Sequence, residues 1–290
     1  MYTIAHLSDL HLTSDPKARR LEPTLGRLVG MNAACKYVLN SIEVRQCNLI
    51  LVTGDVTDRG HIAAWRILDH LLIETGLKSR ASIVPGNHDI CGLSVLRVGL
   101  PNFTEADLKN VRAGLAIVSQ PLRFPWAKVV DPRVVVFGLD TNNSGNWSVA
   151  SNAVGRIGNR QLSRLAELLA KHKDVPVKIV MMHHSPNIPE PQTALRRGRT
   201  PMSLLDRWAH EIPKHDRRAL RYLCVSHRVR LVLHGHLHAA EDRRVNGVRI
   251  IGAPATTQPI QRNTTNPQYQ FYKYTVLGKG GRVIRELKVI

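Results

Sequence analysis

The sequence lacks the features of disulfide-stabilised, membrane-spanning or disordered proteins. It holds four cysteines and no Cys-x-x-Cys pair, so neither a zinc template nor a disulfide framework is expected. No uncharged apolar run approaches the roughly 18 residues of a membrane helix. Residues 1–6 show no basic segment followed by an apolar one, so we expect no signal peptide and a cytoplasmic protein. With 43% hydrophobic residues, the 290-residue chain can bury a large core.

Acidic residues are also scarce. The 22 aspartates and glutamates stand against 41 lysines and arginines, which gives a formal net charge of +19. Such a surplus attracts nucleic acid, an anionic membrane surface or a phosphate-bearing substrate. The basic clusters lack the interleaved aromatic residues that stack on bases, so a solvated, arginine-rich surface is the alternative. The sequence gives no indication of an oligomeric state.

Short apolar runs alternate with helical patterns along the chain. Strands are expected at residues 2–7, 48–52, 81–84, 134–139, 177–182, 230–233 and 248–251, and helices at 31–45, 63–74, 160–172 and, broken, over 201–227. Two alternating segments at 270–277 and 282–289 predict a hairpin around a glycine-rich turn. No linker or repeat interrupts this order. We therefore expect one domain over 1–290, with cap-like specificity segments near 90–132 and 185–213.

Five short blocks, each directly after a predicted strand, concentrate the residues that bind metals. They read DLH at 9–11, GDVTD at 54–58, GNHD at 86–89, HH at 183–184 and GHLH at 235–238. In open α/β sheets ligands bind beyond the carboxyl ends of the strands, so the blocks should meet at one edge. Imidazole together with carboxylate suits Mn, Fe or Zn. Two divalent ions would keep a small positive charge there, which suits a phosphate ester anion.

The five blocks resemble, in order, the motifs of the calcineurin-like metallophosphoesterase superfamily: D-x-H, G-D-x-x-D, G-N-H-[DE], H and G-H-x-H. The resemblance extends from residue 9 to residue 238. It implies an α/β fold, the family's four-layer αββα sandwich with two mixed sheets. It also implies a dinuclear metal site at the carboxyl ends of the strands, where a metal-activated hydroxide hydrolyses a phosphoester.

The same resemblance assigns two sets of metal ligands. One divalent ion would be held by Asp9, His11, Asp55 and His238. The other would be held by Asp55, Asn87, His183 and His236. Asp55 would therefore bridge the two ions.

Four further residues are given roles at the substrate. In the resemblance His88 faces the leaving-group oxygen as general acid, and Asp58 orients it. An imidazole held by a carboxylate has a raised pKa and stays protonated near neutrality. Arg59 matches an arginine that grips phosphate in the phosphoprotein phosphatase branch, although that position varies elsewhere in the superfamily. His184 follows a ligand and either contacts substrate or supports the ligand from behind.

The motifs define the reaction but leave the substrate open. The HHSP and LHGHLH stretches look most like the bacterial branch of class III cyclic-nucleotide phosphodiesterases and glycerophosphodiesterases. A small anionic phosphodiester is therefore the first expectation. The alternatives are a UDP-2,3-diacylglucosamine pyrophosphatase of lipid A synthesis, which would bring peripheral membrane contact, a DNA or RNA nuclease, and a phosphomonoesterase. A binding scaffold would need a broken ligand set, and none of the ligand positions is broken.

Overall fold

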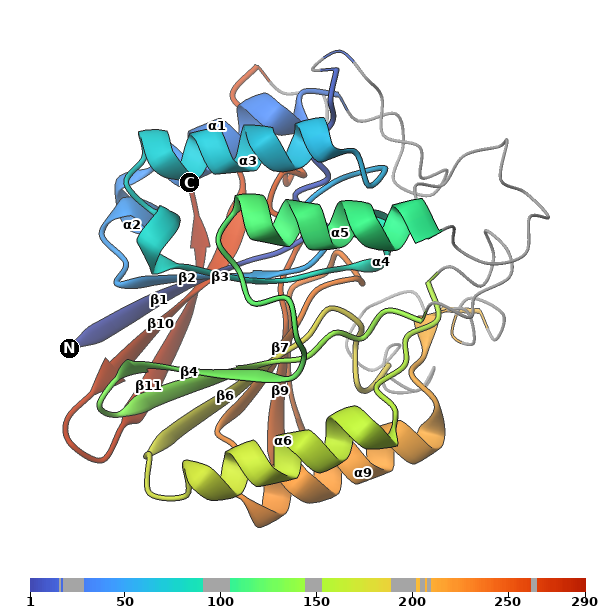
Figure 1. The fold of residues 1–290 in the computed structure, drawn as a ribbon. Helices are drawn as coiled ribbons and strands as arrows, with labels where there is room; N and C mark the ends of the chain where they lie inside the picture. Colours follow the sequence, from blue (N-terminus) through green and yellow to red (C-terminus); the bar gives the residue numbers. More distant parts are fainter. Residues whose placement is uncertain are drawn as a thin grey trace.

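Two β-sheets lie face to face in the middle of the molecule, with helices on both outer sides (Figure 1). The computed structural model describes residues 1–15, 17, 29–90, 105–143, 153–188, 202, 203, 207, 210–261 and 265–290. The order of layers is helices, sheet, sheet, helices. This arrangement confirms the predicted four-layer α/β sandwich with two mixed sheets.

The first sheet has the strand order β11-β10-β1-β2-β3. Its strands are β1 (Tyr2–Leu7), β2 (Leu49–Thr53), β3 (Ala81–Val84), β10 (Gln270–Leu277) and β11 (Arg282–Val289). β1, β2 and β3 run parallel, whereas β10 and β11 form the predicted C-terminal hairpin and pair antiparallel with β1.

The second sheet has the strand order β4-β5-β6-β7-β9-β8. Its strands are β4 (Trp126–Asp131), β5 (Val134–Gly138), β6 (Val177–Met181), β7 (Leu231–His234), β8 (Glu241–Val245) and β9 (Val248–Gly252). The four central strands are parallel, and an antiparallel strand closes each edge. Neither edge strand was expected from the apolar pattern.

Helices cover the outer face of each sheet. Those on the first sheet are α1 (Met31–Asn40), α2 (Ile42–Arg45), α3 (Ile62–Glu74) and α5 (Glu105–Ile117), and those on the second are α6 (Asn159–Lys171) and α9 (Lys214–Ser226). Two short elements, η2 (Lys78–Arg80) and α4 (Asn87–Ile90), flank β3. No helix in the described part of the chain is long and apolar enough to cross a membrane.

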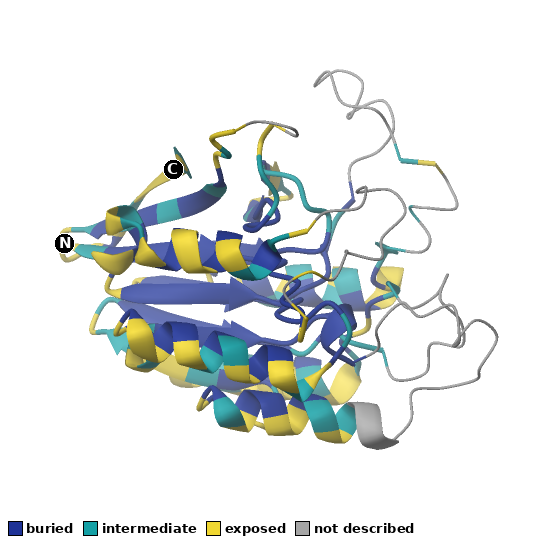
Figure 2. Ribbon diagram, turned by 90° about the horizontal axis from the view of Figure 1, so that it is seen from above, coloured by how far each residue is buried: buried dark blue, intermediate teal, exposed yellow. Residues whose placement is uncertain are grey.

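Three apolar clusters fill the three spaces between the layers. Ala5 and Ile50 face the helices α1, α3 and α5, whereas Ile4 and Leu51, one residue away on the same strands, face the second sheet. Side chains alternate between the faces of a strand, so a sheet covered on both sides needs apolar residues at every position. This explains the continuous apolar strands, which Figure 2 shows as uniformly buried beside helices that are buried on one face only.

The structure refines three of the expected elements. The helix predicted over 31–45 divides at Ser41, which has an extended backbone and accepts a hydrogen bond from the Val44 amide. In the predicted segment 90–132, residues 105–117 form α5 and residues 126–131 form β4, so this part is regular; residues 91–104 lie outside the described residues. Much of 189–209 also lies outside them. The single domain and the two specificity segments stay predictions.

An ion-pair network joins the two sheets at their edges. Asp242 on β8 accepts two hydrogen bonds from Arg249 on β9, both at 2.8 Å, and a third from Arg285 on β11 of the other sheet. Burial alone would raise the pKa of Asp242, but the two arginines outweigh it and hold that pKa below its usual value.

Replacing Asp242 by asparagine is expected to lower the free energy of unfolding at pH 7 by about 0.5–1.5 kcal/mol, since the network is partly solvated. A carboxyl whose pKa falls on folding stabilises the protein above its unfolded pKa of about 3.9, and this contribution disappears as the pH falls through the lower folded value. In urea denaturation the deficit of Asp242→Asn should therefore shrink from pH 7 to pH 3. The exposed Asp174 gives the control Asp174→Asn, and a deficit independent of pH would contradict the assignment.

Candidate metal centre

The predicted ligands converge because each follows one of the strands that run parallel within the two sheets. Asp9 and His11 follow β1, Asp55 follows β2, Asn87 opens α4 just after β3, His183 follows β6, and His236 and His238 follow β7. Hydrogen bonds join the two sheets at this edge. The His183 Nδ1 lies 2.8 Å from the Thr53 carbonyl oxygen, and the His236 amide donates to both carboxylate oxygens of Asp9 at 3.2 Å.

The chain turns sharply where these side chains leave the strands. Five of the predicted ligands have a left-handed backbone: Asp9 (φ 53°), His11 (φ 47°), Asp55 (φ 48°), His236 (φ 69°) and His238 (φ 50°). Residues with a Cβ atom seldom adopt this conformation, which carries a cost of about 1–3 kcal/mol each when the surroundings impose it. Such strain gathers at functional sites, and here it aims the side chains at one point.

The first group consists of Asp9, His11, Asp55 and His238, whose nearest nitrogen and oxygen atoms all lie within 4.8 Å of one another. The His238 Nε2 is 3.1 Å from Asp9 Oδ1 and 3.4 Å from the His11 Nε2. The His11 Nε2 is in turn 3.7 Å from Asp55 Oδ2. Four potential ligand atoms therefore face one small volume, as a metal site requires.

The second group shares Asp55 with the first. Asp55, His183 and His236 again place one ligand atom each within 4.8 Å of the others. The His183 Nε2 lies 3.3 Å from Asp55 Oδ2 and 3.0 Å from the side-chain oxygen of Asn87. The structure therefore brings the residues of each predicted ligand set together, with Asp55 common to both groups, and their roles as ligands stay predictions.

His236 offers the clearest sign that these residues fit a metal ion. Its Nε2 is buried and has no hydrogen-bond partner among the described residues. Burial, and then the neighbouring His184, lower the pKa of His236 well below its usual value, so the ring is neutral. A neutral imidazole with a free lone pair is a metal ligand, whereas a buried polar nitrogen without any partner costs free energy.

The two buried carboxylates keep their charge. Burial raises the pKa of Asp9, but His238 outweighs it, and His183 does the same for Asp55, so both pKa values lie below the usual range. Burial likewise lowers the pKa of His183, but Asp55 and Asp9 raise it to about 9. Two fully buried carboxylates among histidines form a site that is built for positive charge.

His88 and Asp58 lie together beside the first group. The His88 Nδ1 is 3.0 Å from the backbone carbonyl oxygen of Asp58, while the Asp58 carboxylate is 3.3 Å from the Nδ1 of His11. The resemblance implied that Asp58 orients His88. In the structure its carbonyl contacts His88, and its carboxylate reaches His11, one of the predicted ligands. A carboxylate on the far nitrogen of a metal-binding histidine fixes that ring's orientation and tautomer.

The two predicted substrate-binding residues differ in exposure. Arg59 is 37% exposed, and its Nε lies 3.5 Å from Asp58 Oδ2, so it stands at the rim of the site. His184 is fully buried, its Nδ1 is 2.8 Å from the Thr141 hydroxyl, and its ring centre is 4.5 Å from that of His236. Because His184 is buried, its position favours a role in supporting the predicted metal ligands over contact with the substrate. Contact with substrate stays a prediction for Arg59.

Sequence reasoning gave no role to two residues that the structure brings to the site. Asp89 is fully buried and accepts hydrogen bonds from the amides of Val56, Thr57 and Gly86, which ties two of the ligand loops together. Burial and the charge of Asp55 raise its pKa to about 7. Its position in the GNHD block could have indicated this. His210, with its ring centre 4.9 Å from that of His236, lies in no motif.

Three glycines leave room for the ligands. A Cβ atom on Gly54 would overlap the His183 ring, one on Gly86 would overlap the Asp55 carboxylate, and one on Gly235 would overlap Ser8 and Asp9. The glycines of the motifs are therefore needed for close packing around the metal-binding groups.

Comparison with known proteins agrees with this geometry. A family model described as calcineurin-like phosphoesterase matches residues 2–240. Since the match spans most of the chain, the protein belongs to the calcineurin-like phosphoesterase family. Membership confirms the predicted family and the predicted enzyme class, a hydrolase acting on phosphoester bonds.

Curated relatives carry related names. A "cAMP/cGMP dual specificity phosphodiesterase" of Mycobacterium tuberculosis is 29% identical over 262 residues, which are 88% of this chain and 67% of that protein. A "Probable cyclic nucleotide phosphodiesterase" of Vesicomyosocius okutanii is 21% identical over 96% of this chain and 95% of its own length. Among solved structures, a dimetal phosphatase from Danio rerio superposes with a TM-score of 0.61 at 16% identity, over 99% of this chain and 98% of that one, which shows a shared fold.

Proposed function

We propose that the protein is a phosphodiesterase that hydrolyses small nucleotide phosphodiesters, cyclic nucleotides among them, with two divalent metal ions. The observation that carries the proposal is the pair of ligand groups that share the Asp55 carboxylate. The names of the curated relatives support the choice of a cyclic nucleotide as the first substrate to test.

In this proposal the ligand sets are those expected from the motifs. The first ion would be held by Asp9, His11, Asp55 and His238, and the second by Asp55, Asn87, His183 and His236. Bound together, the ions would lower the pKa of water and offset the charge of the phosphate in an in-line displacement. Imidazole and carboxylate ligands favour Mn, Fe or Zn. The identity of the metal and the cytoplasmic location stay predictions.

The proton that the leaving group needs would come from His88. Its ring is buried, lies with its centre 4.6 Å from that of His11, and is not a member of either ligand set. When Nδ1 donates its proton to the Asp58 carbonyl oxygen, 3.0 Å away, Nε2 is left to carry the proton that is transferred. Asp58 would then act as a positioning residue for His88 and for His11. Arg59 would contact the phosphate from the rim.

Asn87→Ala tests the second ligand set. The change removes one ligand oxygen beside His183 and leaves the first set complete. We expect the manganese content to fall from two ions per chain towards one, and kcat/KM for 3′,5′-cyclic AMP to fall at least about 100-fold. Asn40→Ala, at the exposed end of α1, is the matched control. Full activity in Asn87→Ala would contradict a two-metal site.

His88→Ala tests the proton transfer. An alkoxide leaving group needs a proton, whereas p-nitrophenolate leaves without one, so the loss should depend on the substrate. We expect kcat for cyclic AMP to fall by about 10²–10⁴-fold and kcat for bis(p-nitrophenyl) phosphate to fall much less. The 79% exposed His70 on α3 gives the control His70→Ala. Equal losses on the two substrates would contradict a general acid at His88.

A further inference from the structure

A large cavity lies between α5 and α6, next to the carboxyl end of β5. Its volume is about 1480 Å³, whereas small-molecule sites commonly measure about 300–1,000 Å³. Apolar side chains of α5 and of the chain before β4 form part of its lining, including Leu115, Leu122 and Phe124. The cavity is therefore larger than a compact cyclic nucleotide requires.

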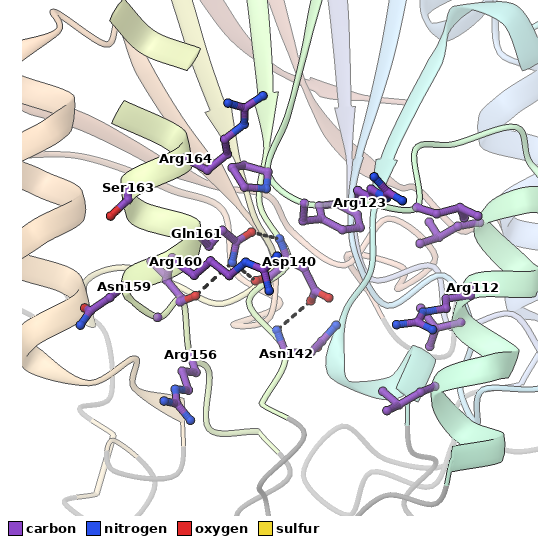
Figure 3. A pocket seen from close by; sticks show the side chains of 18 of the residues that line it. Arg112, Arg123, Asp140, Asn142, Arg156, Asn159, Arg160, Gln161, Ser163 and Arg164 are labelled. Carbon is purple, nitrogen blue, oxygen red and sulfur yellow. Dashed lines mark hydrogen bonds between the residues drawn. The ribbon is translucent and has the colours of Figure 1, made fainter. Parts of the chain in front are cut away.

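Five arginines from separate parts of the chain line this cavity, and Figure 3 shows them on both of its sides. Arg112 on α5 and Arg123 before β4 lie on one side, and Arg156, Arg160 and Arg164, in or just before α6, lie on the other. We call this cavity with its five arginines the arginine groove. Among the described residues, its lining has two carboxyl groups, those of Asp140 and Glu167.

In the part of the chain that the structure describes, four of these five arginines have no carboxylate partner. Glu167 pairs with Arg164, but among the described residues Arg112, Arg123, Arg156 and Arg160 have no ion-pair partner. All four guanidinium groups are exposed around one cavity, so a bound anion would meet favourable charge there. The planar, forked guanidinium matches the oxygens of a phosphate group in two-point hydrogen bonds.

The arginine groove begins beside the candidate metal centre. Its lining includes Ile90, three residues after Asn87, and Asp140 and Asn142, which follow β5. β5 is paired in parallel with β6, which leads into His183. Thr141, between Asp140 and Asn142, contacts His184. A molecule held at the metal centre could therefore extend into the groove.

We propose that the arginine groove binds a second phosphate group of the substrate, so that the enzyme prefers nucleotide phosphodiesters that carry a further phosphate away from the scissile bond. The inference rests on the proposed phosphodiesterase function and narrows its substrate class. The metal centre holds the scissile phosphate, the apolar lining accommodates the nucleoside, and Arg112 and Arg160 on opposite sides hold the second phosphate.

Two synthetic esters test this preference, since they differ by one phosphate only. They are the p-nitrophenyl ester of thymidine 5′-phosphate and the same ester with an added 3′-phosphate. We expect the manganese-loaded protein to show a kcat/KM about 10-fold or more higher for the ester with the second phosphate, as charge-assisted hydrogen bonds give. In the double variant Arg112→Glu/Arg160→Glu the ratio of the two kcat/KM values should fall to about one or below.

The ratio of the two kcat/KM values distinguishes binding in the arginine groove from a general effect of charge. Lys279→Glu/Arg282→Glu makes the same change in charge at exposed sites near the start of β1, at the opposite end of the strands, and should keep the parent ratio. A parent ratio near one, or a ratio unchanged in the double variant, would overturn the proposal.

A binding measurement separates failure of the groove from failure of the proposed function. If neither ester is hydrolysed, the phosphodiesterase proposal fails, and the groove is tested with thymidine 3′,5′-bisphosphate by calorimetry. The double variant should then bind it about 10-fold more weakly than the parent and Lys279→Glu/Arg282→Glu. Equal affinities in all three proteins would overturn the groove as a phosphate site.

Discussion

The site depends on one constraint: two clusters of histidine share a single buried negative charge. The Asp55 carboxylate is almost completely buried, and it lies between His11 on one side and His183 on the other. A buried carboxylate is strongly unfavourable unless positive charge and hydrogen bonds surround it. The His88 amide donates to it at 2.9 Å, and the two metal ions of the proposal would supply the rest of the compensation. Gly86 must stay small so that this carboxylate fits.

The fold supplies what this charge needs. Parallel strands in two sheets end at one edge, so groups from distant parts of the sequence meet there, and the left-handed turns after the strands aim the side chains inward. Continuous apolar strands, packed on both faces, resist the local strain of those turns. Asp89 then locks the loops after β2 and β3 together through three backbone amides. The well-packed layers therefore tolerate the strained backbone of the loops.

The sequence predicts the central strands, the four-layer fold and the ligand groups because apolar runs and fixed motifs carry those signals. Other features depend on contacts that no local pattern contains. β8 is a polar edge strand, and only the Asn246-Gly247 turn, with both φ angles positive, marks its hairpin. The motif predicts that Asp58 orients His88, but it does not indicate whether the backbone carbonyl or the side-chain carboxylate of Asp58 makes the contact. The arginine groove joins α5 and α6, and their basic residues are far apart in sequence.

The most direct test of the account is electron paramagnetic resonance of the manganese-loaded protein, with the metal content measured on the same sample. Two ions that share the Asp55 carboxylate would lie about 3.5–4 Å apart, and their electron spins would couple. The account predicts two manganese ions per chain and a coupled signal, with the coupling lost in Asp55→Asn. One ion per chain, or two ions with independent signals in the parent protein, would contradict it.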